Sequence, residues 1–240
     1  MSENFRKDYL DLNAFRGLGE DPAYTLPELV DRPRAWPLSR WAEAPCDLGF
    51  NDFLNCQWKG MRLLKDPETQ SAYHNLLWEL RPRTIIELGI YSGASLVWFR
   101  DLIRLMGIDC KVIGFDKNLT RNRIPASEMD NITLIEGDCN DLSTLEPLLA
   151  HADQPVLLID DAHWNTFNVM SWATARLLKP GDYFIIEDMI QFWDRYSPKL
   201  LSEYLASFDN VLEMDMLYAN TCPQLQRGVF RRSSVQQQGA

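Results

Sequence analysis

The sequence predicts an α/β protein with a doubly wound, mostly parallel sheet. Short runs of apolar, often β-branched residues recur from residue 84 onward, and helical patterns separate them. Runs that are largely apolar are typical of strands covered on both faces, and strand–helix alternation indicates right-handed βαβ units. The five runs are 84–86, 112–115, 132–135, 156–159 and 183–186.

Two of the intervening segments have clear helical spacing. In the first, apolar residues recur three and four positions apart, at Leu96, Phe99, Ile103 and Met106. The second extends over 167–178 and ends at Lys179-Pro180-Gly181. We predict a helix for each. Beyond them, 211–218 and 227–231 are predicted as closing strands, whose short spacing favours an antiparallel hairpin.

The first eighty residues differ from the rest in their sequence pattern. Prolines punctuate 21–37, which we interpret as an ordered, irregular arm. Residues 57–80 are predicted to be more helical, with apolar stripes that break near a helix N-terminus at Pro67. We therefore divide the chain into residues 1–80, for oligomerisation or substrate cover, and one α/β domain at 81–240. Arg62 and Lys65 are interpreted as solvated helix charges, or alternatively as contacts for an anionic substrate.

The composition excludes several classes of protein. The 240 residues contain 24 Lys and Arg against 34 Asp and Glu, a net charge of −10, which argues against a general nucleic-acid binder. No apolar run reaches the length of a membrane span, and residues 1–10 are polar and mixed in charge, unlike a signal peptide. The 5 Cys are scattered without a CxxC motif, which is typical of reduced thiols. We expect a cytoplasmic protein that binds neither nucleic acid nor membrane.

Carboxylates follow the predicted strands, at the edge where open α/β sheets bind ligands. They are Glu87, Asp116, Glu136, Asp138, Asp160, Asp161, Glu187 and Asp188. So many like charges at one edge repel one another unless a cation lies among them. The pattern therefore predicts a bound cation or a hydroxyl-rich ligand. For any single carboxylate, a role in capping a strand or the next helix is the alternative.

The turn after the first strand joins an acidic residue to two glycines, in the run ELGIYSGAS at 87–95. It is not a GxGxxG turn, so the dinucleotide fingerprint fails. An acid before the glycines suits an ammonium, a hydroxyl or a sulfonium-bearing nucleoside better than a pyrophosphate. Asp116 follows Gly93 by 23 residues, where this fold places a ribose-hydroxyl acceptor. Asp138 could accept from an adenine amino group.

These motifs carry a family resemblance. ELGIYSGAS, GFD at 114–116 and EGD at 136–138 resemble the first three motifs of class I S-adenosylmethionine-dependent methyltransferases, particularly the small metal-dependent O-methyltransferases of the catechol type. The resemblance is closer to the cephalosporin hydroxylase family, whose members act in the 7α-methoxylation of cephamycins. It spans nearly the whole chain, through FRGLGEDPAY, RWAEAP, LWELRPRTIIELG, IDDAH, GDYFIIEDM and DMLYAN.

The resemblance implies S-adenosylmethionine and Mg²⁺ as cofactors. Residues that would line the methionine and ribose side are Glu87, Gly89, Tyr91, Ser92, Gly93 and Ser95. Asp116 would hold the ribose hydroxyls, and Asp138 with Cys139 would border the adenine. A divalent cation would be bound by Asp161, Glu187 and Asp188, where the catechol-type enzymes have Asp, Asp and Asn. We choose Asp161 over the adjacent Asp160, which could instead face the cofactor.

Such a set of residues has a definite chemistry. Three carboxylates with at most one His suit an oxygen-loving ion such as Mg²⁺ and disfavour zinc. The ion would bind the acceptor hydroxyl, lower its pKa and orient it toward the sulfonium methyl. His163 could contact substrate, act as a base or complete the metal shell, and a hydrogen-bonded loop histidine is the alternative. Trp164 and Trp193 could form an apolar wall for the substrate.

We therefore predict an O-methyltransferase that acts on a hydroxyl of a small natural product, in the first place the 7α-hydroxyl of a cephalosporin. The alternative is a cephalosporin 7α-hydroxylase or an oxygenase-coupling component. A 2-His-1-carboxylate iron site needs two suitably placed histidines, and none of the 3 His is clearly paired. A non-catalytic binding subunit is a third class, which the intact acidic set disfavours. We expect a homo-oligomer, with a partner protein of the methoxylation pathway as an option.

Overall fold

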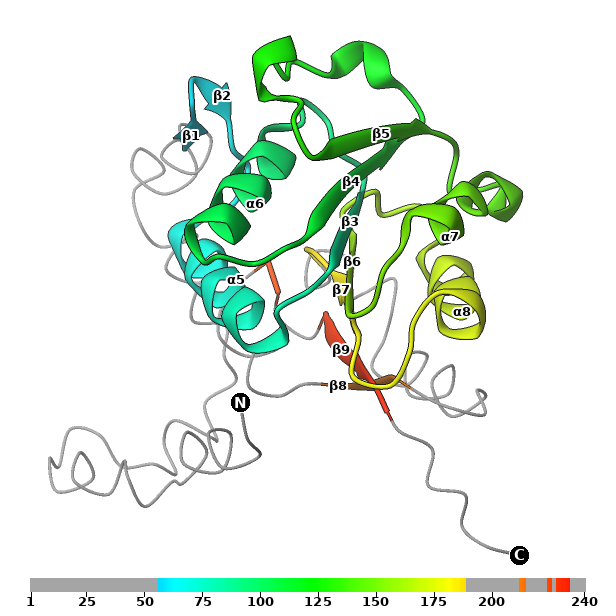
Figure 1. Ribbon diagram of the computed structural model, residues 1–240. Coiled ribbons are helices and arrows are strands. Elements are labelled where there is room, and N and C mark those ends of the chain that lie inside the picture. Colours follow the sequence, from blue (N-terminus) through cyan, green and yellow to red (C-terminus); the bar gives the residue numbers. More distant parts are fainter. Residues whose placement is uncertain (1–55, 189–211, 215–223, 226–227, 234–240) are drawn as a thin grey trace, which may run out of the picture. The chain divides into compact units, whose positions relative to one another are not determined.

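The computed structural model describes residues 56–188, 212–214, 224–225 and 228–233 (Figure 1). All of them belong to one compact unit, which comprises residues 51–240. The predicted arm at 21–37 lies outside the described residues, as does Trp193.

Seven strands form a single, mostly parallel sheet in the order β5-β4-β3-β6-β7-β9-β8. The five parallel strands are β3 (Thr84–Leu88), β4 (Lys111–Asp116), β5 (Ile132–Glu136), β6 (Val156–Asp160) and β7 (Tyr183–Ile186). Each coincides with a predicted apolar run, and every neighbouring pair among them is parallel. The predicted doubly wound sheet is confirmed.

The closing strands run antiparallel, as predicted. β9 (Val229–Arg232) pairs with β7, and β8 (Leu212–Met214) pairs with β9 at the edge of the sheet. The rest of the two predicted strands, at positions 211, 215–218 and 227, lies outside the described residues.

Helices cover both faces of the sheet (Figure 1). Helix α5 (Pro67–Leu80) and helix α6 (Ala94–Leu105) lie on one face, and α7 (Pro147–His151) and α8 (Thr166–Arg176) lie on the other. Short 3₁₀ turns occur at Leu119–Arg121, Ala126–Glu128 and Leu142–Leu145. Among the helices in the described part of the chain, none has both the length and the apolar character needed to cross a membrane.

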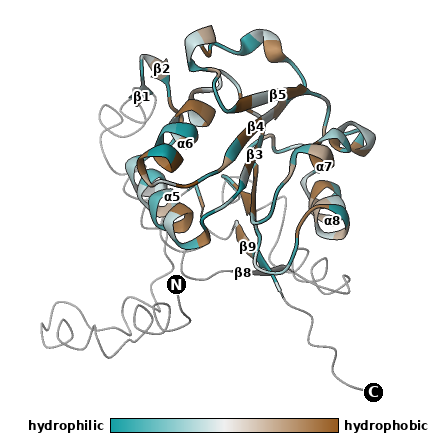
Figure 2. Cartoon of the chain, in the orientation of Figure 1, coloured by the Kyte–Doolittle hydropathy of each residue, from teal (hydrophilic) through white to brown (hydrophobic). Residues whose placement is uncertain are grey.

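Alternation along each strand divides the core in two. Ile85 packs with α5 and α6 in one apolar cluster, whereas Ile86 packs with α7 and α8 in the other. Figure 2 shows hydrophobic residues concentrated along the strands, while the helices carry both hydrophobic and hydrophilic residues. Strands covered on both faces have no polar side, which is why their sequences are nearly continuous apolar runs.

The helical prediction for 57–66 is wrong. This segment is a hairpin of β1 (Gln57–Trp58) and β2 (Met61–Arg62). Lys59 and Gly60 between them have φ of 49° and 78°, as two-residue turns of the primed types require. Met61 and Leu63 are buried while Arg62 is exposed, the alternation of an extended segment. The two strands have only two residues each, and so short a segment does not distinguish the alternation of a strand from the spacing of a helix.

Polar contacts tie this hairpin to α6. The indole of Trp58 donates to Asp101 over 2.8 Å, and the ammonium of Lys59 lies 3.0 Å from the same carboxylate. The buried Arg100 guanidinium lies 2.6 Å from Asp101 on the other side. Because the hairpin is anchored to α6, residues 63–66, which follow it, are held in a fixed position.

Helix α5 begins at Pro67, as predicted, and Asp66 caps it. One carboxylate oxygen of Asp66 accepts from the Thr69 amide (2.7 Å) and the other from the Thr69 hydroxyl (2.9 Å). We expect Asp66→Ala to lower the free energy of unfolding by about 1–2 kcal/mol in urea denaturation, because two buried donors lose their acceptor. Asp66→Asn keeps one amide-facing oxygen and should lose less. Equal stability of all three proteins would show that the cap contributes nothing.

Candidate functional site

The candidate site lies where the winding of the sheet reverses direction. β3 and β6 are neighbours, but the chain passes from β3 outward to β4 and β5 before it returns to β6. A crevice forms outside the carboxyl ends of strands at such a point. Tyr91, His163 and Asp188, in the loops that follow β3, β6 and β7, have φ of 48°, 59° and 53°. Non-glycine residues in this conformation concentrate at functional sites.

A pocket of about 210 Å³ occupies this crevice, and a smaller one of about 30 Å³ adjoins it. The large pocket is lined by six of the predicted site residues: Gly89, Tyr91, Asp116, Asp138, Cys139 and Asp161. The small pocket is lined by Ser92 and Ser95, and shares Gly89, Tyr91 and Asp161 with the large one. Most of the residues that the sequence predicts to contact ligands therefore lie around these two adjoining pockets.

Gly89 is required by a close approach of two loops. Its φ is +86°, and a Cβ there would lie 2.7 Å from the Cα of Ala162 in the loop after β6. Gly93 has a φ of +83° and is the N-cap of α6, where a Cβ would meet Ile124. Gly93 lines neither pocket, so it shapes the turn rather than the pocket wall.

Asp116 both closes the loop after β3 and lines the pocket. One oxygen accepts from the amides of Ile90 (3.0 Å) and Tyr91 (3.3 Å), and the other accepts from the Asn118 amide (2.9 Å). The carboxylate therefore fixes the glycine turn against the end of β4.

Asp138 and Cys139 form another part of the wall of the large pocket. The backbone and side-chain amides of Asn140 both donate to Asp138 over 2.9 Å and hold the pKa of that carboxyl below its usual value. Burial raises the pKa of the Cys139 thiol to about 12. Because only a thiolate is a good nucleophile, Cys139 is a neutral packing residue at this wall.

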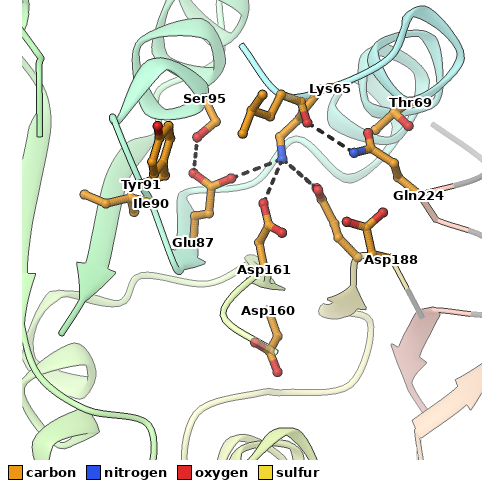
Figure 3. A network of polar contacts seen from close by, with 12 residues as sticks. Lys65, Thr69, Glu87, Ile90, Tyr91, Ser95, Asp160, Asp161, Asp188 and Gln224 are labelled. Carbon is orange, nitrogen blue, oxygen red and sulfur yellow. Dashed lines mark hydrogen bonds and ion pairs between the residues drawn. The ribbon is translucent and has the colours of Figure 1, made fainter. Parts of the chain in front are cut away.

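A buried ammonium lies among the carboxylates (Figure 3). Nζ of Lys65 is 2.7 and 2.9 Å from the two oxygens of Glu187, 3.2 Å from Glu87 and 3.7 Å from Asp161. Lys65 is 1% exposed and precedes α5. Its interpretation as a solvated helix charge is therefore wrong, and the acidic edge of the sheet already contains one cation from the chain itself.

Glu87 and Glu187 are the buried partners of Lys65. Tyr73 donates to Glu187 and Ser95 donates to Glu87 through their hydroxyls. Burial raises the pKa of Glu187 to about 8 and also raises the pKa of Glu87, while Lys65 acts in the opposite direction on both. Glu87 lines neither pocket, so its hydroxyl donor, Ser95, stands between it and any ligand there.

Three side chains form a candidate metal centre. The ligand atoms of Asp161, His163 and Asp188 all lie within 4.8 Å of one another. Nε2 of His163 is 3.3 Å from Asp161 and 3.9 Å from Asp188. Among the described residues no other group of three such side chains was found. Glu187 is next to this group in sequence, and its assignment as a metal ligand stays a prediction because both its oxygens accept from Lys65 here.

The pKa values of this group reflect crowding of negative charge. Burial and the charge of Asp161 raise the pKa of Asp188 to about 6. Burial alone would lower the pKa of His163, but its hydrogen bond to Asp161 and the neighbouring carboxylates outweigh that effect and raise it. Carboxylates that hold protons this firmly lack sufficient positive charge nearby.

The two adjacent aspartates have different surroundings. Asp160 is buried, and one of its oxygens accepts from the amides of Ala162 (3.1 Å) and His163 (3.3 Å). Figure 3 shows it pointing away from Lys65, toward which Asp161 points. Asp161 lines both pockets and Asp160 lines neither. The structure thus groups Asp161, and not Asp160, with the possible metal ligands.

Several site residues were missed from the sequence. Lys117 and Arg121 line the large pocket, and the ammonium of Lys117 lies 5.4 Å from the ring centre of Trp164. Trp164, which was predicted as a possible apolar wall for the substrate, also lines this pocket. Gln224 donates to the carbonyl of Leu64 over 3.1 Å from the far end of the chain. The excess of carboxylates at the edge could have indicated an internal cation, but nothing local distinguishes Lys65 from a surface lysine.

Comparisons with known proteins agree with this geometry. A family model described as Rhamnosyl O-methyltransferase/CmcI matches residues 52–195. An apo-structure of CmcI is 62% identical, covers 98% of this chain and 100% of its own, and superposes with a TM-score of 0.73. A CmcI structure with Mg and SAM is also 62% identical, covers 97% of this chain and 100% of its own, and has a TM-score of 0.72.

Similarity to curated sequences is more distant. The rhamnosyl O-methyltransferase of Mycobacterium leprae (strain TN) is 27% identical over 138 residues, which are 55% of this chain and 59% of that protein. A rhamnosyl O-methyltransferase of Mycobacterium tuberculosis (strain ATCC 25618 / H37Rv) is 25% identical over 138 residues. The chain therefore spans less than two thirds of the length of the curated relatives it matches, at 59% and 56%.

The close approach at Gly89 can be measured against a matched glycine. Gly107 also has a positive φ, +63°, but no atom lies within 4 Å of its would-be Cβ. We expect Gly107→Ala to cost about 1 kcal/mol of unfolding free energy for its backbone conformation. Gly89→Ala should cost about 1–3 kcal/mol more in urea denaturation, because the new methyl group overlaps the backbone at Ala162. Equal losses at the two positions would contradict the constraint.

Proposed function

Because the chain belongs to the Rhamnosyl O-methyltransferase/CmcI family, we propose that it transfers the methyl group of S-adenosylmethionine to a hydroxyl of a small natural product, with Mg²⁺ as the required cation. One observation carries the proposal: possible metal ligands, Asp161, His163 and Asp188, lie together beside a pocket lined by Gly89, Asp116 and Asp138. The fold is that of class I S-adenosylmethionine-dependent O-methyltransferases.

The large pocket would hold the methyl donor. Asp116 and Asp138 offer carboxylate oxygens for hydroxyl and amino groups of a nucleoside, and Cys139 offers an apolar wall. The small pocket, with Ser92 and Ser95, would take the methionine end. The other residues proposed for this site, Glu87, Gly93 and Asp160, act from behind the pocket walls as hydrogen-bond acceptors or as a turn.

The donor set beside the pocket fits a divalent cation. Asp161 and Asp188 offer hard oxygen ligands, which Mg²⁺ prefers, and we propose Glu187 as the third carboxylate. Burial and the charge of Asp161 raise the pKa of Asp188 to about 6, and a cation bound between the two carboxylates would lower it. When bound, the ion lowers the pKa of the acceptor hydroxyl and fixes its oxygen near the donor methyl. We propose His163, whose Nε2 lies 3.3 Å from Asp161, as the group that accepts the hydroxyl proton.

We propose the 7α-hydroxyl of a cephalosporin as the acceptor. The 62% identity to CmcI over nearly the whole chain supports it, as does the motif resemblance to the cephalosporin hydroxylase family. The curated relatives are named rhamnosyl O-methyltransferases, so a rhamnosyl hydroxyl is the acceptor to compare. We further propose a cytoplasmic homo-oligomer in which residues 1–80 serve assembly or cover the substrate.

Oxygenation by a bound iron is disfavoured. The chain has 3 His, and the candidate metal group in the described residues contains one of them, His163. His74 packs beside Trp98, and His151 ends α7. A 2-His-1-carboxylate site needs two imidazoles at one ion, so methyl transfer is the better reading of these residues.

The proposal is tested first by calorimetry of S-adenosylmethionine binding with Mg²⁺ and with EDTA. Mass spectrometry then follows methylation of a 7-hydroxycephalosporin and of a rhamnoside. We expect Asp161→Asn to lower the Mg²⁺-dependent rate by about 100-fold or more, because a charged ligand that orients the ion is replaced by a neutral amide. Its circular dichroism should match that of wild type.

Asp153→Asn is the matched control, since Asp153 pairs with Lys111 on the surface, 2.7 Å away. It should retain the wild-type rate. Failure to bind S-adenosylmethionine under either condition would overturn the methyltransferase proposal. A full rate in Asp161→Asn would overturn the metal assignment alone.

Mg²⁺ affinity should increase with pH. The pKa of Asp188 is about 6, so a proton occupies this carboxylate below that value and must leave when the cation binds. We expect the affinity to rise by up to about tenfold per pH unit below about pH 6 and to level off above it. Calorimetry in two buffers of different ionisation enthalpy counts the protons released. A pH-independent affinity with no proton release would contradict the expectation.

A further inference from the structure

Lys65 is the feature of the site that methyl transfer itself does not explain. Glu87 and Glu187 are both 0% exposed, and a buried carboxylate is costly unless it is paired and hydrogen-bonded. Among the described residues, Lys65 is the one cation that contacts either of them, at 3.2 and 2.7 Å. It also lies 3.7 Å from Asp161, a proposed metal ligand. The ammonium of Lys65 thus contacts both the two buried glutamates and one proposed ligand of the metal centre.

The backbone around Lys65 is held on both sides. The carbonyl of Lys65 accepts from the side chain of Gln70 over 2.8 Å. The Gln224 side chain accepts from the amide of Asp66 (3.3 Å) and donates to the carbonyl of Leu64 (3.1 Å). These contacts fix the backbone on both sides of Lys65, and the ion pairs with Glu187 and Glu87 fix its ammonium.

The same glutamine reaches the metal centre. The backbone carbonyl of Gln224 accepts from the amide of Asp188 over 2.8 Å. Gln224 therefore links the segment that carries Lys65 to the loop that carries Asp188 (Figure 3). A built-in positive charge and a proposed metal ligand are positioned by one buried residue.

We propose that Lys65 is a positioning residue of the metal centre, an internal counter-ion that holds Glu187 in place and compensates Glu87. Four carboxylates, Glu87, Asp161, Glu187 and Asp188, then face one ammonium and one divalent cation. This inference rests on the proposed function, because it presupposes a divalent cation at Asp161 and Asp188. A lysine with a merely structural role would contribute packing and hydrogen bonds but would not change the response to a cation.

The test measures melting temperature with EDTA and with saturating Mg²⁺. Lys65→Met replaces the ammonium, which lies 5.7 and 5.9 Å from the ring centres of Tyr73 and Phe99, with an uncharged thioether side chain. In EDTA we expect it to melt about 10 °C below wild type, because two buried carboxylates lose their counter-ion. Mg²⁺ should raise its melting temperature by about 5 °C more than it raises that of wild type, because the ion replaces part of the missing charge.

Two control variants separate charge from packing. Lys65→Arg keeps the charge and should respond to Mg²⁺ as wild type does, whatever its own melting temperature. Lys111→Met removes a charge that is 52% exposed and pairs with Asp153 on the surface. It should leave both melting temperatures unchanged, because surface pairs contribute little.

The outcomes distinguish this inference from the proposed function. If Mg²⁺ does not raise the melting temperature of wild type, the metal proposal fails. If it raises wild type and Lys65→Met equally, or if Lys65→Met is as stable as wild type in EDTA, the counter-ion inference is overturned and the metal proposal stands.

A variant that removes both charges covers the case in which Lys65→Met does not fold. Lys65→Met combined with Glu187→Gln deletes one positive and one negative charge, so the double variant should be more stable in EDTA than Lys65→Met alone. Additive losses, or a double variant that is also unfolded, would overturn the inference.

Discussion

Negative charge concentrates at the carboxyl edge of this sheet, and the buried contact between Lys65 and Glu187 makes that concentration tolerable. Parallel strands end on the same side, so the acids that follow β3, β6 and β7 converge whatever their individual roles. Two groups donate hydrogen bonds to Glu187 at this edge: the ammonium of Lys65, from the segment before α5, and the hydroxyl of Tyr73 in that helix. Residues 63–80, which precede the first parallel strand, are therefore part of the site. Their position in turn depends on the hairpin anchored at Asp101 and on the cap at Asp66.

The main sheet could be predicted because its strands satisfy one simple rule. A parallel strand between two helical layers has no polar face, so 85–86 and 156–159 are apolar throughout, unlike a surface segment. The hairpin at 57–62 could not be predicted from the same kind of pattern. Its alternation of Met61, Arg62 and Leu63 lasts too few residues, and its turn depends on positive φ at a lysine as well as at a glycine.

The site residues likewise fall into two groups: those that local sequence patterns predict, and those brought in from distant parts of the sequence. Gly89, Asp116, Asp138 and Asp161 lie within a residue or two of a strand end, so predicting the strands also placed them. Lys65 and Gln224 are recruited across 122 and 160 positions of sequence, to Glu187 and Leu64. Only the folded chain shows these contacts. The difference between Asp160 and Asp161 is also tertiary, since Asp160 turns back to accept from the loop amides while Asp161 faces the pockets.

The 122-residue separation of Lys65 from Glu187 has a consequence for the order in which the protein is made. At a ribosomal rate of about 5–20 residues per second, the lysine waits roughly 6–24 seconds for its carboxylate to be synthesised. During that interval Glu87 is the only one of its two buried carboxylate partners that has been made, so Lys65 lacks its shortest ion pair. Gln224, which holds the backbone on both sides of Lys65, is synthesised later still. The cation-binding edge therefore reaches its full set of contacts only after nearly the whole chain has been synthesised.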